Sequence, residues 1–233
     1  MIRRAAIVLA VALFGLVFAG LLVGHVERQS LPPLGKHYVE LVPRELGAAN
    51  VITGILLSYR AFDTLGEVAV LFMVAAGVGL VLARRERRKE NLLGDARLAT
   101  RQASEIVRTG AQILVPLIAI FAAYIITNGH LSAGGGFQGG AVAASSAILL
   151  LLADPRQRFD QQLLSGTEST AGILFVLVGV AGLIFANGFL DSRVLPLGQF
   201  GTFFSAGAIP LLSVLLGVKV GCELSVILDR FRT

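Results

Sequence analysis

Residues 109–129 read TGAQILVPLIAIFAAYIITNG, a run of 21 residues without a charged side chain. A helix that crosses the hydrocarbon core of a bilayer needs about 20 mostly apolar residues. The run therefore predicts one membrane-spanning helix. Four further charge-free runs have similar lengths: Ala5–Gly24, Leu131–Ala153, Ser169–Leu190 and Val194–Val218.

A sixth run, Leu65–Ala83, carries one charge near its start, Glu67. We therefore predict an all-α integral membrane protein with six transmembrane helices. The stretch 46–59 is uncharged but short, which is more typical of an interfacial or re-entrant segment, with a seventh span as the alternative. The apolar run after Arg3 and Arg4 exceeds the usual core of a signal peptide, so we expect a retained first helix.

Composition supports a membrane protein. Hydrophobic residues make up 55% of the chain, the mean hydropathy is +0.78, and charged residues make up 15%. An ordinary soluble domain has about 25% charged residues. These values exclude a disordered chain and a soluble enzyme with a solvated shell, and a single cysteine excludes a disulfide scaffold.

The distribution of Lys and Arg predicts the orientation. With the N-terminus in the cytoplasm, fourteen of these residues fall on the inner side and five on the outer side. Both termini are then cytoplasmic, and a long outer loop joins the first two helices. The basic run Arg84–Lys89 directly follows a span, which favours an anchor facing anionic lipid over a nucleic-acid site.

A charged, proline-free segment, 84–108, predicts a cytoplasmic surface helix and divides the chain. We predict a two-helix unit over 1–100 and a four-helix domain over 101–233. Small residues recur four apart, as at Gly136/Gly140 and Gly217/Gly221. Such spacing lets helix backbones approach closely in lipid and suits a subunit that packs against neighbours.

One motif, GGGFQGG, stands between two predicted spans. It does not fit a phosphate-binding loop, because no strand precedes it and no Lys-Ser/Thr follows it. It predicts a flexible turn that leads into a tightly packed helix start, with a broken helix lining an ion cavity as the alternative. The motif consists of Gly134, Gly135, Gly136, Phe137, Gln138, Gly139 and Gly140.

Five titratable residues are candidates for an ion pathway: Glu67, Asp63, His130, Lys219 and Glu223. Thr64 and Glu67 fit a helix capping box, but a carboxylate just inside a span is costly and usually functional. His130 is more typical of a hydrogen-bonded residue at a helix end than of a proton relay. The four-residue spacing of Lys219 and Glu223 predicts an interfacial ion pair, or a relay if the pair is buried.

The sequence gives no support for catalysis by this chain. It has no metal-ligand spacing, no nucleophile–base pair, no dinucleotide fingerprint and no haem-ligand pattern. We therefore expect no metal, no cofactor and no catalytic residue.

The stretch 128–140 resembles the signature of the B subunit of Mrp-type multisubunit Na⁺/H⁺ antiporters, with Ala133 where proline is expected. The stretch 50–67 resembles the C-terminal part of the large A subunit, or a separate small subunit of membrane-bound hydrogenases. Ser58 stands there where aspartate is common. Together the two resemblances cover nearly the whole chain and imply a fusion of two neighbouring subunits.

The resemblance implies a non-catalytic membrane subunit of the ion-translocation module of an Mrp-type Na⁺/H⁺ antiporter in a prokaryotic plasma membrane. Its expected partners are large antiporter-like and small membrane subunits, the lipid bilayer, Na⁺ and H⁺, but no nucleic acid. Glu67 is then the strongest ion-path candidate and Asp63 the next.

Three alternatives remain. The chain could serve an ion-pumping respiratory complex, with hydrogenase-type subunits as partners. It could be a structural scaffold. A stand-alone transporter is disfavoured, because the middles of the predicted spans are almost purely apolar.

Overall fold

The computed structural model describes the backbone of residues 2–25, 29–93, 103–154 and 157–232. Side chains are described for 4–25, 29–82, 103–154 and 157–231. The side chains of Arg84–Lys89 fall outside these ranges, as does much of the segment 84–108, so their predicted roles remain predictions. The backbone of 84–93 continues the preceding helix rather than starting a new one.

The chain forms two compact units, Met1–His37 and Tyr38–Thr233. The first unit contains α1 (Ile2–Val23), and every described side chain on this helix is exposed. A helix that is apolar all round suits lipid or a neighbouring subunit. The short helix α2 (Pro33–Leu41) runs across the division between the units.

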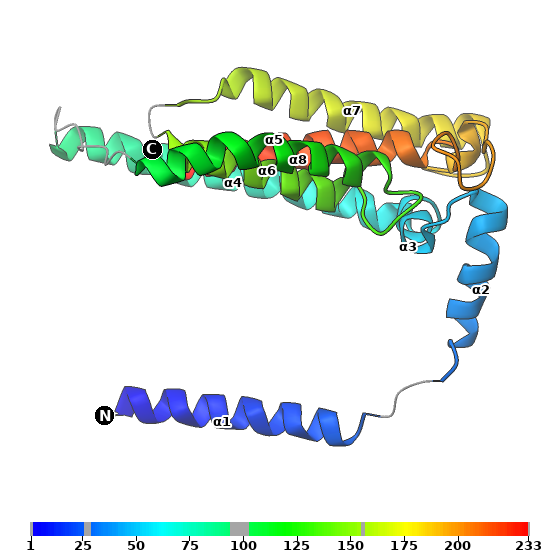
Figure 1. The fold of residues 1–233 in the computed structure, drawn as a ribbon, viewed down its shortest axis with the longest axis horizontal. Helices are drawn as coiled ribbons and strands as arrows, with labels where there is room; N and C mark the ends of the chain where they lie inside the picture. The colour runs from blue at the N-terminus through cyan, green and yellow to red at the C-terminus, as the bar shows by residue number, and fades with distance from the viewer. Residues whose placement is uncertain (1, 26–28, 94–102, 155–156, 233) are drawn as a thin grey trace. The chain divides into compact units, whose positions relative to one another are not determined.

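The second unit is built from five long helices that run alongside one another (Figure 1). They are α4 (Ala61–Leu93), α5 (Glu105–Thr127), α6 (Gly136–Ala153), α7 (Gln161–Phe185) and α8 (Ile209–Arg232). Helix α8 is the central element, because it contacts each of the other four. In its membrane-spanning window 61% of the residues are buried, the highest share among the described spans.

The prediction of an all-α membrane protein is confirmed. The described residues contain six helices that are long and apolar enough to cross a membrane, and their only β pairing is an isolated bridge between Gly198 and Ser205. The cytoplasmic placement of the termini stays a prediction. Within the second unit, the two loops that follow α5 and α7 lie at the same end of the helices (Figure 1).

Close packing through small residues is also confirmed. A Cβ added to Gly140 of α6 would lie 2.8 Å from the carbonyl oxygen of Gly217 in α8. A Cβ added to Gly136 would lie 2.6 Å from the Cβ of Leu216. Both distances are shorter than side-chain carbons tolerate, so glycine is required for α6 and α8 to approach this closely.

The segment 46–59 forms two short helical turns instead of a span. A turn of α-helix, α3 (Val51–Gly54), leads into a π-helical turn, Ile55–Tyr59. Another π-helical turn, Val42–Leu46, precedes them. Thr53, Gly54 and Leu57 are buried in the second unit. The described residues in this region therefore give no support to a seventh span.

The predicted last span, Val194–Val218, is wrong at both ends. Residues 195–208 form a loop in which Gly198, Gly201 and Gly207 adopt left-handed φ angles of 65°, 80° and 57°. Helix α8 begins at Ile209 and continues to Arg232, past Lys219 and Glu223. The hydropathy of an apolar loop resembles that of a helix, and the two charges falsely indicated the end of the span.

The predicted capping box at Thr64 and Glu67 is also wrong. Helix α4 begins at Ala61, so Thr64 lies within its first turn rather than at its N-cap. The Thr64 hydroxyl instead donates a hydrogen bond to the carbonyl oxygen of Leu56, at 2.7 Å. This bond satisfies a carbonyl of the preceding π-helical turn.

Candidate functional site

A cluster of three buried ionisable side chains lies between α7 and α8. The Nζ atom of Lys219 is 2.5 Å from Oε2 of Glu223 and 3.8 Å from Oε1 of Glu168. The side chains of Lys219 and Glu223 are 1% and 0% exposed, and that of Glu168 is 7% exposed. Charged residues are almost never buried to this extent unless they are paired.

Helix geometry explains why these residues meet. Lys219 and Glu223 are four residues apart on α8, so their side chains lie on the same face. Glu168 comes from the second turn of α7, which packs along α8. Phe72 of α4 completes the surroundings, with its ring centroid 3.7 Å from the Lys219 Nζ atom, a cation–π contact.

The cluster carries more negative than positive groups. Two carboxylates face one ammonium group, and the Oε1 atom of Glu223 is buried with no hydrogen-bond partner among the described residues. A buried carboxylate oxygen without a partner costs free energy, because it has lost its hydration without replacement. Such an atom is suited to binding a proton.

The interfacial placement predicted for Lys219 and Glu223 is wrong, and Glu168 was not among the predicted site residues. The predicted span began at Ser169, directly after Glu168, but α7 begins at Gln161 and carries Glu168 inside the spanning segment. The uncharged residues 161–167 were the available signal, because they contain no helix breaker other than one glycine. The description of the span middles as almost purely apolar is therefore corrected.

Glu67 lies in a different place, at the mouth of a pocket of about 440 Å³. Its side chain is exposed on α4, whereas the neighbouring Thr64 is buried. The pocket is bounded by the short turns of 52–57, the glycine motif and α8, including Gly134, Phe137, Gln138 and Ser213. The predicted motif and the predicted ion-path acid thus share one pocket.

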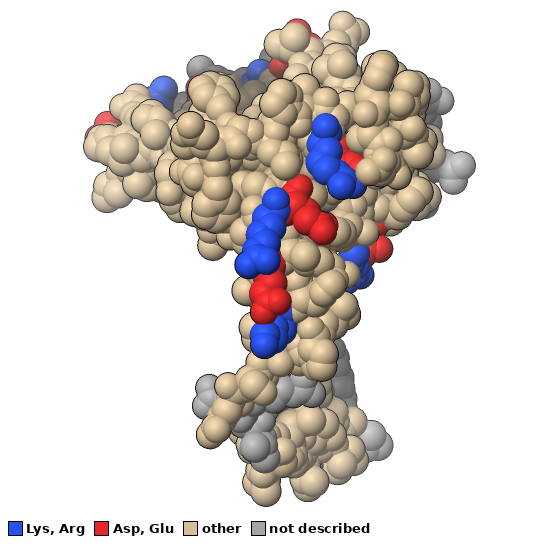
Figure 2. Space-filling view, turned by 90° about the vertical axis from the view of Figure 1, so that its right-hand side faces the viewer, with Lys and Arg blue, Asp and Glu red and all other residues tan. Residues whose placement is uncertain are grey.

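Asp63 lies one helical turn before Glu67 on α4. Its carboxylate forms an ion pair with Arg60, and the two side chains are 45% and 61% exposed. Figure 2 shows basic and acidic side chains beside one another on this end of the molecule. Exposed pairs of this kind contribute little to stability.

The glycine motif is held by hydrogen bonds from the preceding part of the chain. The side-chain amide of Asn50 donates to the carbonyl oxygens of Gly129 and Ser132, at 2.8 Å each. The Thr53 hydroxyl donates to the Gly134 carbonyl oxygen, at 3.3 Å. Gly134 and Gly135 have φ angles of 149° and 148°, which favour glycine. The motif is therefore a turn that enters a tightly packed helix, as predicted.

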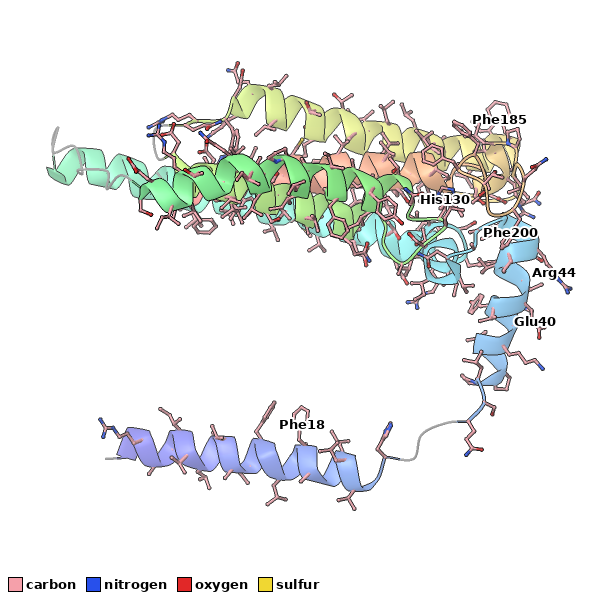
Figure 3. All side chains as sticks on the ribbon, in the orientation of Figure 1. Phe18, Glu40, Arg44, His130, Phe185 and Phe200 are labelled. Carbon is pink, nitrogen blue, oxygen red and sulfur yellow. The ribbon has the colours of Figure 1, made fainter. Side chains whose placement is uncertain are left out.

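His130 is fully buried after the end of α5, near the loop that carries Phe200 (Figure 3). Its ring packs edge-on to Phe203, with 6.4 Å between the centroids. Neither ring nitrogen receives or donates a standard hydrogen bond within the described part of the chain. Burial lowers the pKa of His130, and backbone groups of Thr202 and Phe203 partly oppose this. The predicted hydrogen-bonded helix end is therefore wrong for its side chain.

The pocket of Glu67 and the buried cluster lie along the same pair of helices. On α4, Phe72 follows Glu67 by five residues, which is about 7.5 Å along the axis. On α8, Lys219 follows Ser213 by six residues, about 9 Å. Ser213 lines the pocket, and its buried hydroxyl has no hydrogen-bond partner among the described residues. The α4–α8 interface thus brings two polar regions within the thickness of one membrane.

Comparison with known proteins places this site in a family. Residues 106–226, slightly more than half of the chain, match the domain related to the MnhB subunit of the Na⁺/H⁺ antiporter. Residues 1–98 match the family of the MBH protein MbhE. The chain therefore belongs to the family of domains related to the MnhB antiporter subunit. The predicted resemblance to a fusion of two subunits is confirmed.

Two solved structures resemble the chain over nearly its full length. One is a chain of the membrane-bound sulfane sulfur reductase, an archaeal respiratory membrane complex. It is 34% identical, with a TM-score of 0.77 and coverage of 99% of this chain and 98% of that chain. The other belongs to the Mrp complex of Dietzia sp. DQ12-45-1b, at 25% identity and a TM-score of 0.73, covering 98% of this chain and 26% of that one.

Two curated relatives agree with this family. A probable K⁺/H⁺ antiporter protein of Rhizobium meliloti, its combined A/B subunit, is 28% identical over 203 residues, and the match spans 20% of its length. An uncharacterized protein of Methanocaldococcus jannaschii is 29% identical over 240 residues, covering 93% of this chain and 88% of that protein. These likenesses and the six candidate spans identify a multi-pass membrane protein of the Mrp-related type.

Proposed function

We propose that this chain is a non-catalytic membrane subunit of the ion-translocating module of a multisubunit complex, with Na⁺ and protons as the transported ions. The observation that carries the proposal is the match of its two parts to two subunits of such complexes, over 1–98 and 106–226. The exposed apolar surface of α1 supports it, because such a surface suits lipid and neighbouring subunits.

The first candidate is an Mrp-type cation/proton antiporter, as the family and the likeness to the Mrp complex favour. The second is a respiratory complex that couples a redox reaction to ion transport. A specific observation favours the second: the likeness to the sulfane sulfur reductase chain has the higher identity and TM-score. In both candidates the chain binds neighbouring subunits and performs no redox chemistry itself.

Glu67 is the acid that we assign to the ion pathway. A carboxylate in a membrane span is costly and is usually retained for function. Glu67 is exposed on α4 beside a pocket that also contains polar groups of the glycine motif and Ser213. In the assembled complex a neighbouring subunit would cover this face and turn the pocket into part of an enclosed path.

Purification from native membranes in a mild detergent tests the proposal. The tagged chain should elute as a large assembly whose mass spectrum contains antiporter-like subunits. Iron–sulfur or other redox subunits in the same assembly would select the respiratory candidate, and their absence would select the antiporter. A tagged, unrelated membrane protein of the same cells is the control. Elution of the chain alone and monodisperse would refute the proposed function.

A further inference from the structure

We propose that Glu168, Lys219 and Glu223 form a proton-binding site inside the membrane-spanning part of this chain. The inference deepens the proposed function, which supplies a reason for protons to reach the site. The site itself is defined by contacts within one chain, so it can be tested without knowing which complex contains it.

Charge balance is the first argument. With all three groups ionised, the cluster has a net charge of −1, since two carboxylates surround one ammonium group. An uncompensated charge in a buried, low-dielectric site is costly, and such groups tend to change protonation state instead. Uptake of one proton makes the cluster neutral. In this step a carboxyl O–H bond forms as an O–H bond of a donor water breaks.

An unsatisfied atom shows where the proton fits. Glu223 uses Oε2 for Lys219, whereas its Oε1 atom is buried without a hydrogen-bond partner among the described residues. Glu168 has a longer contact with Lys219, at 3.8 Å, and is therefore less firmly held as an anion. The two carboxylates interact through one ammonium group, so they bind the proton as a pair.

A metal cation fits this cluster less well than a proton does. The Lys219 ammonium group already lies within 4 Å of both carboxylates. A second cation in the same space would be repelled by it, and in a buried site this repulsion is poorly screened. Among the described residues, no group of three His, Cys, Asp or Glu side chains is placed to hold a metal ion.

The other charged groups nearby do not remove the imbalance. On α8, Asp229 and Arg230 have opposite formal charges, and Arg230 lies within electrostatic range of Glu168. Cys222 is a half-buried thiol near Glu168. The facing element α4 contributes the uncharged ring of Phe72. Helix α6 has no titratable side chain, and α5 contributes Glu105 and Arg108 in its first turn and Tyr124 near its other end.

A polar pocket offers a route to the cluster. It has a volume of about 520 Å³ and is lined by Gln161, Gln162, Ser165, Gly166, Ser169 and Arg230. Two of these residues, Ser165 and Ser169, are three residues before and one residue after Glu168 on α7. A polar lining can hold water within a protein, and water conducts protons to a buried acid.

Infrared spectroscopy tests the proposal. The assembled complex, with this chain carrying ¹³C-labelled glutamate, is titrated while the C=O stretching band of protonated carboxylic acid is recorded. We expect a labelled band that disappears as the pH rises. The band should be lost in Glu168→Gln and in Glu223→Gln, because each variant leaves one carboxylate and one ammonium group, which are neutral together. The control Glu105→Gln, at an exposed position, should retain it.

Two results would overturn the site: a wild-type complex without a titrating glutamate band, or a band that survives in both glutamine variants. The wild-type spectrum decides the first point even if a variant fails to assemble. Failure of the proposed function is a separate result, because it appears as the absence of partner subunits while the titrating band can still be present.

Discussion

The Nζ atom of Lys219 lies 2.5 Å from the Oε2 atom of Glu223, and neither side chain is more than 1% exposed. Removal of one partner from a buried ion pair leaves an uncompensated charge and costs about 3–5 kcal/mol. We therefore expect Glu223→Gln to destabilise the chain less than Lys219→Met does, because Glu168 remains to pair with Lys219 in the first variant. In the second variant two carboxylates face each other.

Denaturant unfolding in detergent micelles measures this order. The double variant Lys219→Met with Glu223→Gln removes both charges of the close pair, so it should be more stable than Lys219→Met alone. Equal stability of the single and double variants would show that the two side chains are not coupled.

Glu67→Gln should lower the rate of ion transport by the assembled complex at least about tenfold, equivalent to ~1.36 kcal/mol of activation free energy. The amide cannot bind and release a proton. Asp63→Asn should have a smaller effect, because that carboxylate is engaged in an exposed ion pair with Arg60. Transport is measured in membrane vesicles with a pH-sensitive dye, and assembly is checked by gel filtration. Glu105→Gln serves as the control, and full transport by Glu67→Gln would favour a scaffold.

Gly140→Ala should destabilise the packing of α6 on α8. The new Cβ would lie 2.8 Å from the carbonyl oxygen of Gly217 and 2.8 Å from the Cβ of Val220. Overpacking of this kind costs about 1–3 kcal/mol. Gly166→Ala is the matched control, because a Cβ at that position in α7 meets nothing within 4 Å. Thermal unfolding followed by circular dichroism should separate the two variants, and equal melting temperatures would contradict the close approach.

Asp191 predicts a pH dependence in the loop after α7. Its carboxylate accepts hydrogen bonds from the Arg193 side chain, which lower its pKa, and burial partly opposes this. The folded pKa lies below the ordinary value of 3.8, so the stabilisation is fully present above pH 3.8 and is lost as the pH falls through the folded pKa. We expect Asp191→Asn to cost about 1 kcal/mol at neutral pH, because Arg193 is partly exposed to solvent.

Unfolding of the wild type and Asp191→Asn at a series of pH values measures this effect. The difference in stability between the two should be constant near neutral pH and should shrink in acid. A difference that grows on acidification would mean that the carboxylate is not stabilised as an anion in the folded state.

Hydropathy predicted most of the fold because membrane spans are selected for apolar length. It failed at α8, where the loop 195–208 is as apolar as a helix and is distinguished by the backbone angles of its glycines. The same error placed Lys219 at a membrane surface. Glu168 was missed because its importance depends on the packing of α7 against α8, and no spacing within one helix reveals a partner on another.

The glycine motif was predictable as a turn, since glycine clusters at helix starts have few other physical explanations. Its anchoring by Asn50 and Thr53 was not predicted, because those residues lie about 80 positions earlier in the chain. The sequence thus located both polar regions only in part, and the helix pairs brought them together.

The ammonium group of Lys219 and the aromatic ring of Phe72 belong to stretches that match two different subunit families. One continuous polypeptide supplies both in a fixed one-to-one ratio and at high effective concentration. A split of the gene between α4 and α5 would make this cation–π contact depend on the association of two separate proteins.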